Sequence, residues 1–356
     1  MKKHLQELKR VRAGIYRDTN RGLFLDRNER IVPFDKETIK DLSKKLAQLP
    51  FNLYPELDPF YQKLAQWLDI PKDCIFVTEG VSGAIKSIIE TITEPGENIV
   101  FPTPTFALYP VYGQMFRVES RTVGYTSDYQ LNIEQLLSFI DNKTSIVFLP
   151  NPNMPIEGTL DLDRIRVIAD KCEEHHAYLA IDEVYYPFGG PTAISLIKDY
   201  ENLFVMRSFS KAFGLAGIRV GYLLGSEKPI EYVSKTRTAY ETNSVSIEIA
   251  SFFIENFHLI EKYINQVKEG FYYLKQELDQ LGLEYNGGNT GNFLYINLRD
   301  QVFAENVLKT LREKKIYIRG GWPAPYAQGV CISGAPKNII EEFFHEFSDA
   351  FTKLSA

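Results

Sequence analysis

The chain has 356 residues, of which 44% are hydrophobic and 24% are charged, and this size and composition suit a globular protein with a large core and two domains. Its formal net charge of -6 excludes the uniformly positive surface with which nucleic-acid-binding proteins neutralise phosphates. The absence of any apolar run of about eighteen residues excludes a membrane-spanning helix, and no apolar stretch of the kind found in secretory signals follows the charged first residues.

Short apolar runs alternate with longer amphipathic stretches through the first two thirds of the chain, which predicts βαβ units around a mostly parallel sheet. We expect strands at residues 74–78, 98–101, 116–123, 145–149, 178–181, 203–208 and 221–225. Apolar residues at helical spacing predict helices at 82–93, 133–140 and 162–175. The expected fold class is therefore α/β, with a doubly wound large domain.

The pattern changes to long helices in the last third of the chain. We expect a helix over 246–281, a strand over 293–298 and a closing helix from Lys337 onward, which together predict a smaller α+β domain. The expected division is an N-terminal arm at 1–30, a large domain at 31–245 and a small C-terminal domain at 246–356. Because no Gly/Ser-rich linker interrupts the chain, we expect the two domains to pack closely.

The turn after the first predicted strand has the features of a phosphate site. Gly80 opens this turn, and Ser82 begins an amphipathic helix. The free N–H groups and the positive dipole end of a helix N-terminus suit an anion, so Gly80, Val81 and Ser82 are candidate phosphate ligands. The alternative is that Ser82 only caps the helix.

The predicted strand at 178–181 is followed directly by a carboxylate, Asp182, and then by Glu183. In an open α/β sheet, functional groups gather at the carboxyl ends of the strands. A pair of acidic residues in this position is also common as the cap of a following helix, so the residues alone leave both roles open.

A further segment, SFSKAFGLAGIRVGY from Ser208 onward, combines hydroxyls, one lysine, three glycines and an arginine directly after an apolar strand. A lysine in this position can form an imine with an aldehyde cofactor when burial and neighbouring cations lower its pKa. Lys211 has this position. A phosphate dianion can be held by Ser208, Ser210 and Arg219. The alternative is a solvated lysine on a glycine-containing turn.

This segment resembles the SxSKxxGLAGxRxGY signature of the class I/II aminotransferases of fold type I, which use pyridoxal 5'-phosphate (PLP), and it is closest to the histidinol-phosphate aminotransferase group. The resemblance implies the fold of that family, PLP as the cofactor and Lys211 as the residue that holds PLP through an imine. DEVYYPF similarly resembles the family's DEAYxEF element. Asp182 is then expected to pair with the pyridine nitrogen, and Tyr185 to hydrogen-bond the phenolate oxygen.

Two more elements of the cofactor site carry the same resemblance. EGVSG resembles the family's GADE/GSSE-type loop, which supports Gly80, Val81 and Ser82 as the phosphate cup. FPTPTFALYP resembles the PTYxxY element, which implies that Phe106 stacks on the pyridine ring. Aromatic residues in such a run also commonly belong to the core.

NPNMPIEG, residues 151–158, stands where the family has NPNNPTG. Met154 occupies the place of the asparagine that binds the ring oxygen of the cofactor, and one extra residue precedes the glycine. Asn153 is therefore the candidate for this contact, through a shifted backbone, unless Tyr185 makes it alone.

Two N-terminal elements also resemble the family. NLYPELDPF resembles the RYPD element, whose tyrosine reaches the phosphate in the neighbouring subunit, so Tyr54 implies a homodimer with shared active sites. LFLDRNER resembles the LxxNE element after the N-terminal arm, which implies that Tyr16, Arg17, Asn28 and Glu29 line the substrate entrance. The alternative for these residues is an exposed arm rich in Arg and Asp.

The C-terminal region departs from the family at the substrate end. Family members have RIxxG, whose arginine pairs with a carboxylate or a phosphate of the substrate. Here VCISGAP places Val330 at the arginine when Gly334 is aligned, with Cys331 beside it, and neither side chain can hold an anion. Arg319, in IYIRGG, remains as a nearby cation and as the candidate substrate-binding residue.

The expected activity is transamination of a small phosphorylated substrate, with Lys211 moving the proton and glutamate as the usual donor. Loss of the anion-pairing arginine makes PLP-dependent decarboxylation of an amino-acid O-phosphate, of the phosphoserine or phosphothreonine type, the alternative. A remote alternative is a non-catalytic PLP-binding protein. We expect no nucleic-acid, membrane or metal partner, and the three widely spaced cysteines, which form no CxxC pair, indicate a reduced, cytoplasmic setting.

Overall fold

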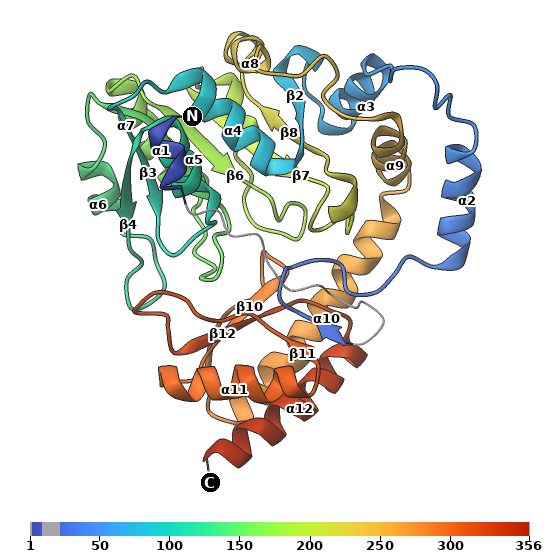
Figure 1. Ribbon diagram of the computed structural model, residues 1–356, viewed down its shortest axis with the longest axis vertical. Coiled ribbons are helices and arrows are strands. Elements are labelled where there is room, and N and C mark those ends of the chain that lie inside the picture. Colours follow the sequence, from blue (N-terminus) through green and yellow to red (C-terminus); the bar gives the residue numbers. More distant parts are fainter. Residues whose placement is uncertain (1, 9–21, 356) are drawn as a thin grey trace.

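The computed structural model describes residues 2–8 and 22–355, and its largest feature is a mixed sheet of seven strands (Figure 1). In spatial order, the strands are β2 (Ile75–Thr78), β8 (Gly221–Leu224), β7 (Leu203–Ser208), β6 (Tyr178–Asp182), β5 (Thr144–Pro150), β3 (Asn98–Pro102) and β4 (Glu119–Val123). Of the seven strands of this sheet, β8 is the one that runs opposite to the other six. The mostly parallel large sheet predicted from the alternating pattern is confirmed.

Helices cover both faces of this sheet because its strands are apolar on both sides. In β5, Ile146 and Phe148 belong to one buried cluster, and Val147 and Leu149 belong to the other. The first cluster includes residues of α4 (Gly80–Ile92), α5 (Leu108–Phe116) and α8 (Glu227–Ser234). The second includes residues of α3 (Asp58–Leu68), α6 (Ile133–Ser138), α7 (Leu162–Glu174) and α9 (Ser244–Glu255). The sheet is therefore sandwiched between two helical layers.

A second, antiparallel sheet has the strand order β12 (Gly329–Ser333), β10 (Phe293–Asn297) and β9 (Glu284–Gly287). Three helices accompany it: α10 (His258–Gln280), α11 (Gln301–Glu313) and α12 (Lys337–Ser355). In Figure 1 this sheet, α11 and α12 lie below the large sheet, and α10 runs from one to the other. The α+β character of this region is confirmed, while the boundaries at residues 30 and 245 stay predictions.

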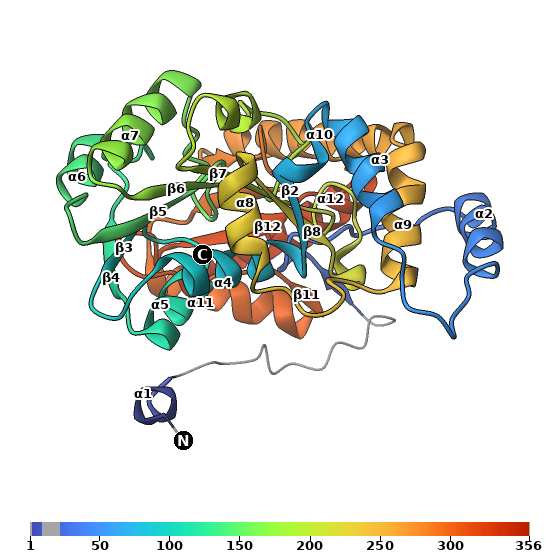
Figure 2. The ribbon, with the colours of Figure 1, turned by 90° about the horizontal axis from the view of Figure 1, so that it is seen from above.

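The remaining elements are short or peripheral. They are α1 (Lys3–Gln6), α2 (Lys36–Leu46), the 3-10 turns η1 (Lys72–Cys74), η2 (Ala193–Lys198) and η3 (Ala216–Ile218), and the parallel pair of β1 (Leu23–Phe24) and β11 (Ile316–Tyr317). Viewed from above, α1 and α2 lie at the periphery of the molecule (Figure 2). No helix of the described residues is both long and apolar enough to cross a membrane.

Two of the expected elements are wrong in their bounds. The strand expected at 116–123 begins only at Glu119, because α5 continues to Phe116 and ends at Arg117, whose φ of 66° is left-handed. The single helix expected over 246–281 consists of α9 and α10, which are separated at Asn256 and Phe257. The apolar spacing continues across this break, so it did not reveal where one helix ends.

Candidate active site

One cavity of about 360 Å³ lies at the carboxyl edge of the large sheet, a volume in the range of small-molecule sites. In the large sheet, β4 lies on one side of β3, and the strands that follow it in the chain, β5, β6 and β7, lie on the other side. The direction of strand addition therefore reverses at β3, and ligands bind open α/β sheets at such a switch point. Thirteen of the residues predicted for the site line this cavity: Asn28, Glu29, Val81, Ser82, Phe106, Asn153, Asp182, Tyr185, Ser208, Ser210, Lys211, Arg219 and Arg319.

Lys211 follows β7 and presents its amine to the cavity. Its Nζ donates a hydrogen bond to the backbone carbonyl of Arg27, at 2.8 Å. Burial lowers the pKa of Lys211 to about 8, helped by the positive charges of Arg319 and Arg219 and opposed by Glu29 and Asp182. A substantial fraction of this amine is therefore neutral near pH 8, as a nucleophile or a base requires.

Asp182 ends β6 and is almost completely buried. Its Oδ2 accepts a hydrogen bond from the hydroxyl of Tyr109 at 2.7 Å, and its Oδ1 accepts one from the backbone N–H of Val184 at 3.0 Å. Burial nevertheless raises the pKa of Asp182 to about 6, because desolvation outweighs these two hydrogen bonds. This carboxylate is therefore suited to pair with a cationic group of a ligand.

Hydroxyls and a guanidinium gather at the other end of the cavity, around the N-terminus of α4. Ser208 donates to Ser210 at 2.9 Å, and the Nη2 of Arg219 lies 3.4 Å from the hydroxyl of Ser82. Gly80, with a φ of 71°, lies directly under this guanidinium, because a Cβ there would be 2.9 Å from Nη2. Together with the helix dipole, these donors form a site for a phosphate dianion.

Tyr185 and Asn28 form the wall between the two sheets. Nδ2 of Asn28 donates to the hydroxyl of Tyr185 at 2.8 Å, and its backbone N–H donates to Ser333 at 2.7 Å. The carbonyl of Asn28 accepts a hydrogen bond from Asn292 at 3.0 Å. Asn28 adopts a left-handed φ of 54°, which Asn tolerates better than most residues. The arm is thus fastened to both sheets at the cavity.

Asn153 and Phe106 lie on the opposite wall. The side chain of Asn153 is fully buried, accepts a hydrogen bond from Thr105 at 2.6 Å and donates one to the carbonyl of Pro104 at 2.9 Å. Its amide therefore already has partners within the protein. Phe106 is 45% exposed at the cavity and packs edge-on against Tyr109, with ring centroids 6.1 Å apart.

Arg319 and Cys331 lie opposite each other across an antiparallel bridge, so their side chains share one face. Arg319 lines the cavity, with its guanidinium stacked over Trp322 at 4.5 Å. In β12, side chains alternate, so Cys331 and Ser333 face the cavity side while Val330 points the other way. Val330 and Cys331 are both buried, and Cys331 is the one that pairs with Arg319.

Two predicted residues of the described chain, Tyr54 and Gly80, do not line this cavity. Tyr54 is 75% exposed and stacks on Tyr240 with ring centroids 4.5 Å apart. Gly80 contributes through its contact with Arg219 rather than as a lining residue. Tyr16 lies outside the described residues, as does Arg17, whereas Glu29 lines the cavity as expected.

The sequence analysis missed several contributors. Tyr109, which hydrogen-bonds Asp182, lies in the same segment as Phe106, and its position three residues further on one helical face was the available signal. Thr105 and Arg27 also line the cavity. Arg27 gave no signal, because it acts on Lys211 through a backbone carbonyl that every residue has.

The residues present fit PLP. The phosphate site lies at one end of the cavity, Asp182 provides a buried carboxylate for the pyridine nitrogen, and the Lys211 amine reaches the same space. Among the described residues, no three His, Cys, Asp or Glu side chains lie close enough to hold a metal ion.

Comparisons with known proteins agree with this geometry. A family model for aminotransferase class I and II matches residues 20–341. A histidinol-phosphate aminotransferase of Caldanaerobacter subterraneus subsp. tengcongensis is 29% identical over 306 residues, which are 83% of each chain. The crystal structure of a histidinol-phosphate aminotransferase from Sinorhizobium meliloti, in complex with PLP, superposes with a TM-score of 0.88 at 20% identity and covers 99% of this chain and 97% of that one.

A third protein of the same fold catalyses a different reaction. The L-threonine-O-3-phosphate decarboxylase from Porphyromonas gingivalis superposes with a TM-score of 0.78 at 20% identity, covering 92% of this chain and 98% of that one. This likeness concerns the fold alone. The match of the family model over most of the chain, together with the cavity built around Lys211 and Asp182, shows that the chain belongs to the aminotransferase class I and II family and is a PLP-dependent aminotransferase.

Proposed function

We propose that the protein transfers an amino group between a small phosphorylated amine and a 2-oxo acid, with histidinol phosphate as the first substrate to test. The observation that carries this proposal is the cavity in which the Lys211 amine and the Asp182 carboxylate share one space with a cation, Arg319. The names of the similar enzymes give the substrate class. Glutamate is the proposed amino donor.

Each residue of the cavity has a defined part in this proposal. When bound, PLP supplies an electron sink next to the α-carbon of the substrate. Ser82, Ser208, Ser210 and Arg219 would hold its phosphate, and Asp182 would keep the pyridine nitrogen protonated. The Nζ of Lys211 would remove the proton from the amine-bearing carbon of the donor and deliver a proton to the α-carbon of the acceptor derived from the 2-oxo acid, and the Arg27 carbonyl would orient this amine between the two steps.

The substrate end of the cavity is organised by Arg319. Its guanidinium stacks on Trp322, and its Nη1 lies 3.9 Å from the sulfur of Met154. These two contacts limit its conformations and direct its donors, so that a phosphate of the substrate can accept two of them. Cys331 supplies no charge here, since burial raises the pKa of its thiol to about 12.

The decisive experiment mixes the PLP-loaded protein with histidinol phosphate and 2-oxoglutarate and measures glutamate. Stoichiometric formation of glutamate supports the proposal, and Arg319→Ala is expected to raise the KM for histidinol phosphate about 10- to 100-fold through the loss of a charged hydrogen-bond donor. Absence of glutamate with active wild-type holoenzyme, at any concentration of histidinol phosphate, contradicts it.

Decarboxylation is the second candidate, because a neutral thiol rather than a cation lies opposite Arg319 across the bridge. O-phosphothreonine and O-phosphoserine are the probes for this arm. Release of carbon dioxide without transfer of nitrogen to 2-oxoglutarate would favour this activity over transamination.

We also propose that the protein is a homodimer in which Tyr54 reaches the phosphate site of the partner. Phe51, Leu53 and Tyr54 are each more than 60% exposed, an unusual cluster of large apolar side chains for a free surface. Sedimentation of the holoenzyme tests this proposal, and a monomer that retains full activity contradicts it. The three unpaired cysteines support a cytoplasmic location.

A further inference from the structure

The carboxylate of Glu157 is buried in a cage of hydrogen-bond donors outside the residues discussed so far. The residue is only 8% exposed and lies in the turn at 151–158. Its Oε1 accepts hydrogen bonds from the backbone N–H groups of Thr290 at 2.7 Å and Gly291 at 2.8 Å, and from the hydroxyl of Thr290 at 3.0 Å. Its Oε2 accepts bonds from Asn289, at 3.1 Å from the backbone and 3.0 Å from the side chain.

No lysine, arginine or histidine of the described residues forms an ion pair with Glu157. Lys275 acts on this cage through Asn289, whose Oδ1 accepts a hydrogen bond from Nζ of Lys275 at 2.8 Å. Burying a charge is costly unless its hydrogen bonds are complete, and this carboxylate meets that condition with donors from a single loop. The loop and the carboxylate therefore hold each other in place.

The loop that surrounds Glu157, residues 288–292, connects β9 to β10 and contains two glycines. Gly287 and Gly288 have φ angles of 112° and 70°, which only glycine adopts without strain, and these angles turn the N–H groups of the loop toward the carboxylate. The backbone of Glu157 is also bound, since its N–H donates to Asn286 at 2.6 Å. Glu157 is thus held through both its backbone and its carboxylate, by β9 and by the loop that follows it.

Each partner in this contact continues into a different wall of the cavity. On the Glu157 side, the same turn carries Met154, whose sulfur contacts Arg319. On the loop side, Asn292 donates to the carbonyl of Asn28, and Phe293 packs against Tyr185 with ring centroids 5.0 Å apart. The hydrogen bonds around Glu157 therefore connect two walls of the cavity. One wall contains Met154 and faces Arg319, and the other is made by Asn28 and Tyr185. We call this connection the joint.

We propose that Glu157 is a positioning residue that sets the distance between these two walls and thereby the shape of the substrate end of the cavity. The phosphate site around Arg219 lies on other elements, after β2 and β7, and does not depend on this joint. Glu157 consequently affects how substrate is held more than how the phosphate of PLP is held.

Glu157→Gln tests the proposal, because it keeps the size of the side chain and places an amide N–H₂ among donors. Hydrogen exchange of the peptide 284–293, followed by mass spectrometry in the holoenzyme, is expected to quicken about tenfold or more. The KM for the substrate that the wild type accepts is expected to rise about tenfold, while the dissociation constant for PLP changes less than about threefold. Thr290→Val, which removes a single donor, is expected to produce the same changes on a smaller scale.

Glu134→Gln, at an exposed carboxylate of α6, is the matched control and leaves all three measurements unchanged. Unchanged exchange in both Glu157→Gln and Thr290→Val overturns the proposal, as does a loss of PLP affinity as large as the rise in KM. Exchange and PLP affinity do not involve a substrate, so they decide the inference even where histidinol phosphate proves to be the wrong substrate. Should Glu157→Gln fail to fold, Thr290→Val decides alone.

Discussion

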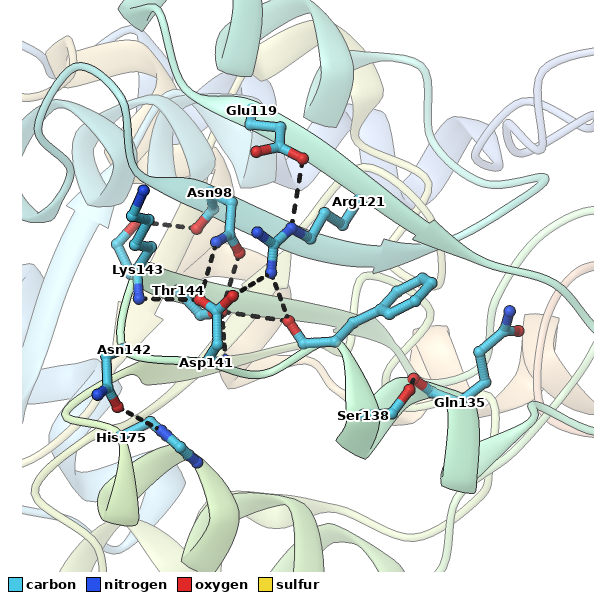
Figure 3. A network of polar contacts seen from close by, with 12 residues as sticks. Asn98, Glu119, Arg121, Gln135, Ser138, Asp141, Asn142, Lys143, Thr144 and His175 are labelled. Atoms are coloured by element: carbon cyan, nitrogen blue, oxygen red, sulfur yellow. Dashed lines mark hydrogen bonds and ion pairs between the residues drawn. The ribbon is translucent and has the colours of Figure 1, made fainter.

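Two aspartates at opposite edges of the large sheet have opposite electrostatic environments. Asp141 precedes β5 at the amino edge, where its carboxylate is the centre of a network (Figure 3). It accepts hydrogen bonds from Arg121 at 2.7 Å, from the backbone of Lys143 at 2.8 Å and from Asn98 at 3.2 Å. These partners, Arg121 above all, lower the pKa of Asp141 to about 2.

Asp182, at the carboxyl edge, has two hydrogen-bond donors and no ion-pair partner among the described residues. Its pKa is raised where that of Asp141 is lowered. The protein thus completes the environment of Asp141 by itself, whereas the charge of Asp182 lacks a partner until a ligand supplies one. Such an incomplete environment around a buried charge is the mark of a functional site rather than a structural one.

Substitution of one lysine at each edge of the sheet is expected to give the largest difference, and this difference is in kcat. Lys211→Ala is expected to lower kcat at least about 1000-fold, because the amine that moves the proton is lost. Lys143→Ala, which removes an exposed side chain beside Asp141, leaves kcat unchanged. Steady-state formation of glutamate measures both variants. Retention of full turnover by Lys211→Ala would remove the chemical basis of the site.

Substitution of the two aspartates is expected to give the next largest difference, in the affinity for PLP. Asp182→Asn is expected to raise the dissociation constant for PLP about 10- to 100-fold, the magnitude of a hydrogen bond to a charged group. Asp141→Asn is expected to leave this constant unchanged, since its network contacts no part of the cavity. Titration of the cofactor-free protein with PLP, followed by absorbance, compares the variants. Equal losses of affinity would show that the contrast between the two edges is not functional.

The smallest expected difference between the two aspartates is in how each makes the free energy of unfolding depend on pH. The raised pKa of Asp182 makes the cofactor-free protein less stable as the pH rises from about 4 to about 6, by about 3 kcal/mol, because the unfolded chain releases this proton first. The lowered pKa of Asp141 makes the folded protein more stable as the pH rises from about 2 to about 4. With this side chain 48% exposed, that gain is about 1 kcal/mol or less.

Urea unfolding of the cofactor-free protein across these two pH ranges measures both slopes. Asp182→Asn is expected to abolish the fall between pH 4 and 6, and Asp141→Asn the rise between pH 2 and 4. A fall that persists in Asp182→Asn would assign the slope to another group.

The residues that the sequence predicted share a physical property. Lys211 and Asp182 are chemically distinctive side chains at or just after the ends of strands, and strand ends are readable from the apolar runs that precede them. Local patterns also predicted all seven strands of the large sheet, because six of them are short runs that are buried on both faces, whereas the edge strand β4 is largely exposed and its start was misplaced. Information of this kind is local in the chain.

Other contributors depend on contacts between distant segments, which local patterns do not contain. The hydrogen bond from Tyr109 to Asp182 spans 73 residues, and those from the loop at 289–291 to Glu157 span more than 130. The side of β12 on which Cys331 points could not be set by alignment on Gly334, because a shift of one residue in a strand exchanges its two faces.

The hydrogen bond between Lys211 and Arg27 also has a consequence for folding. The lining of the cavity extends along the chain from residue 27 to residue 319, so it exists only when the arm and both sheets have docked. Contacts between segments so far apart in sequence carry a high entropic cost and form slowly. Binding of PLP therefore requires the fully assembled cavity, so the absorbance of the bound cofactor reports when folding is complete.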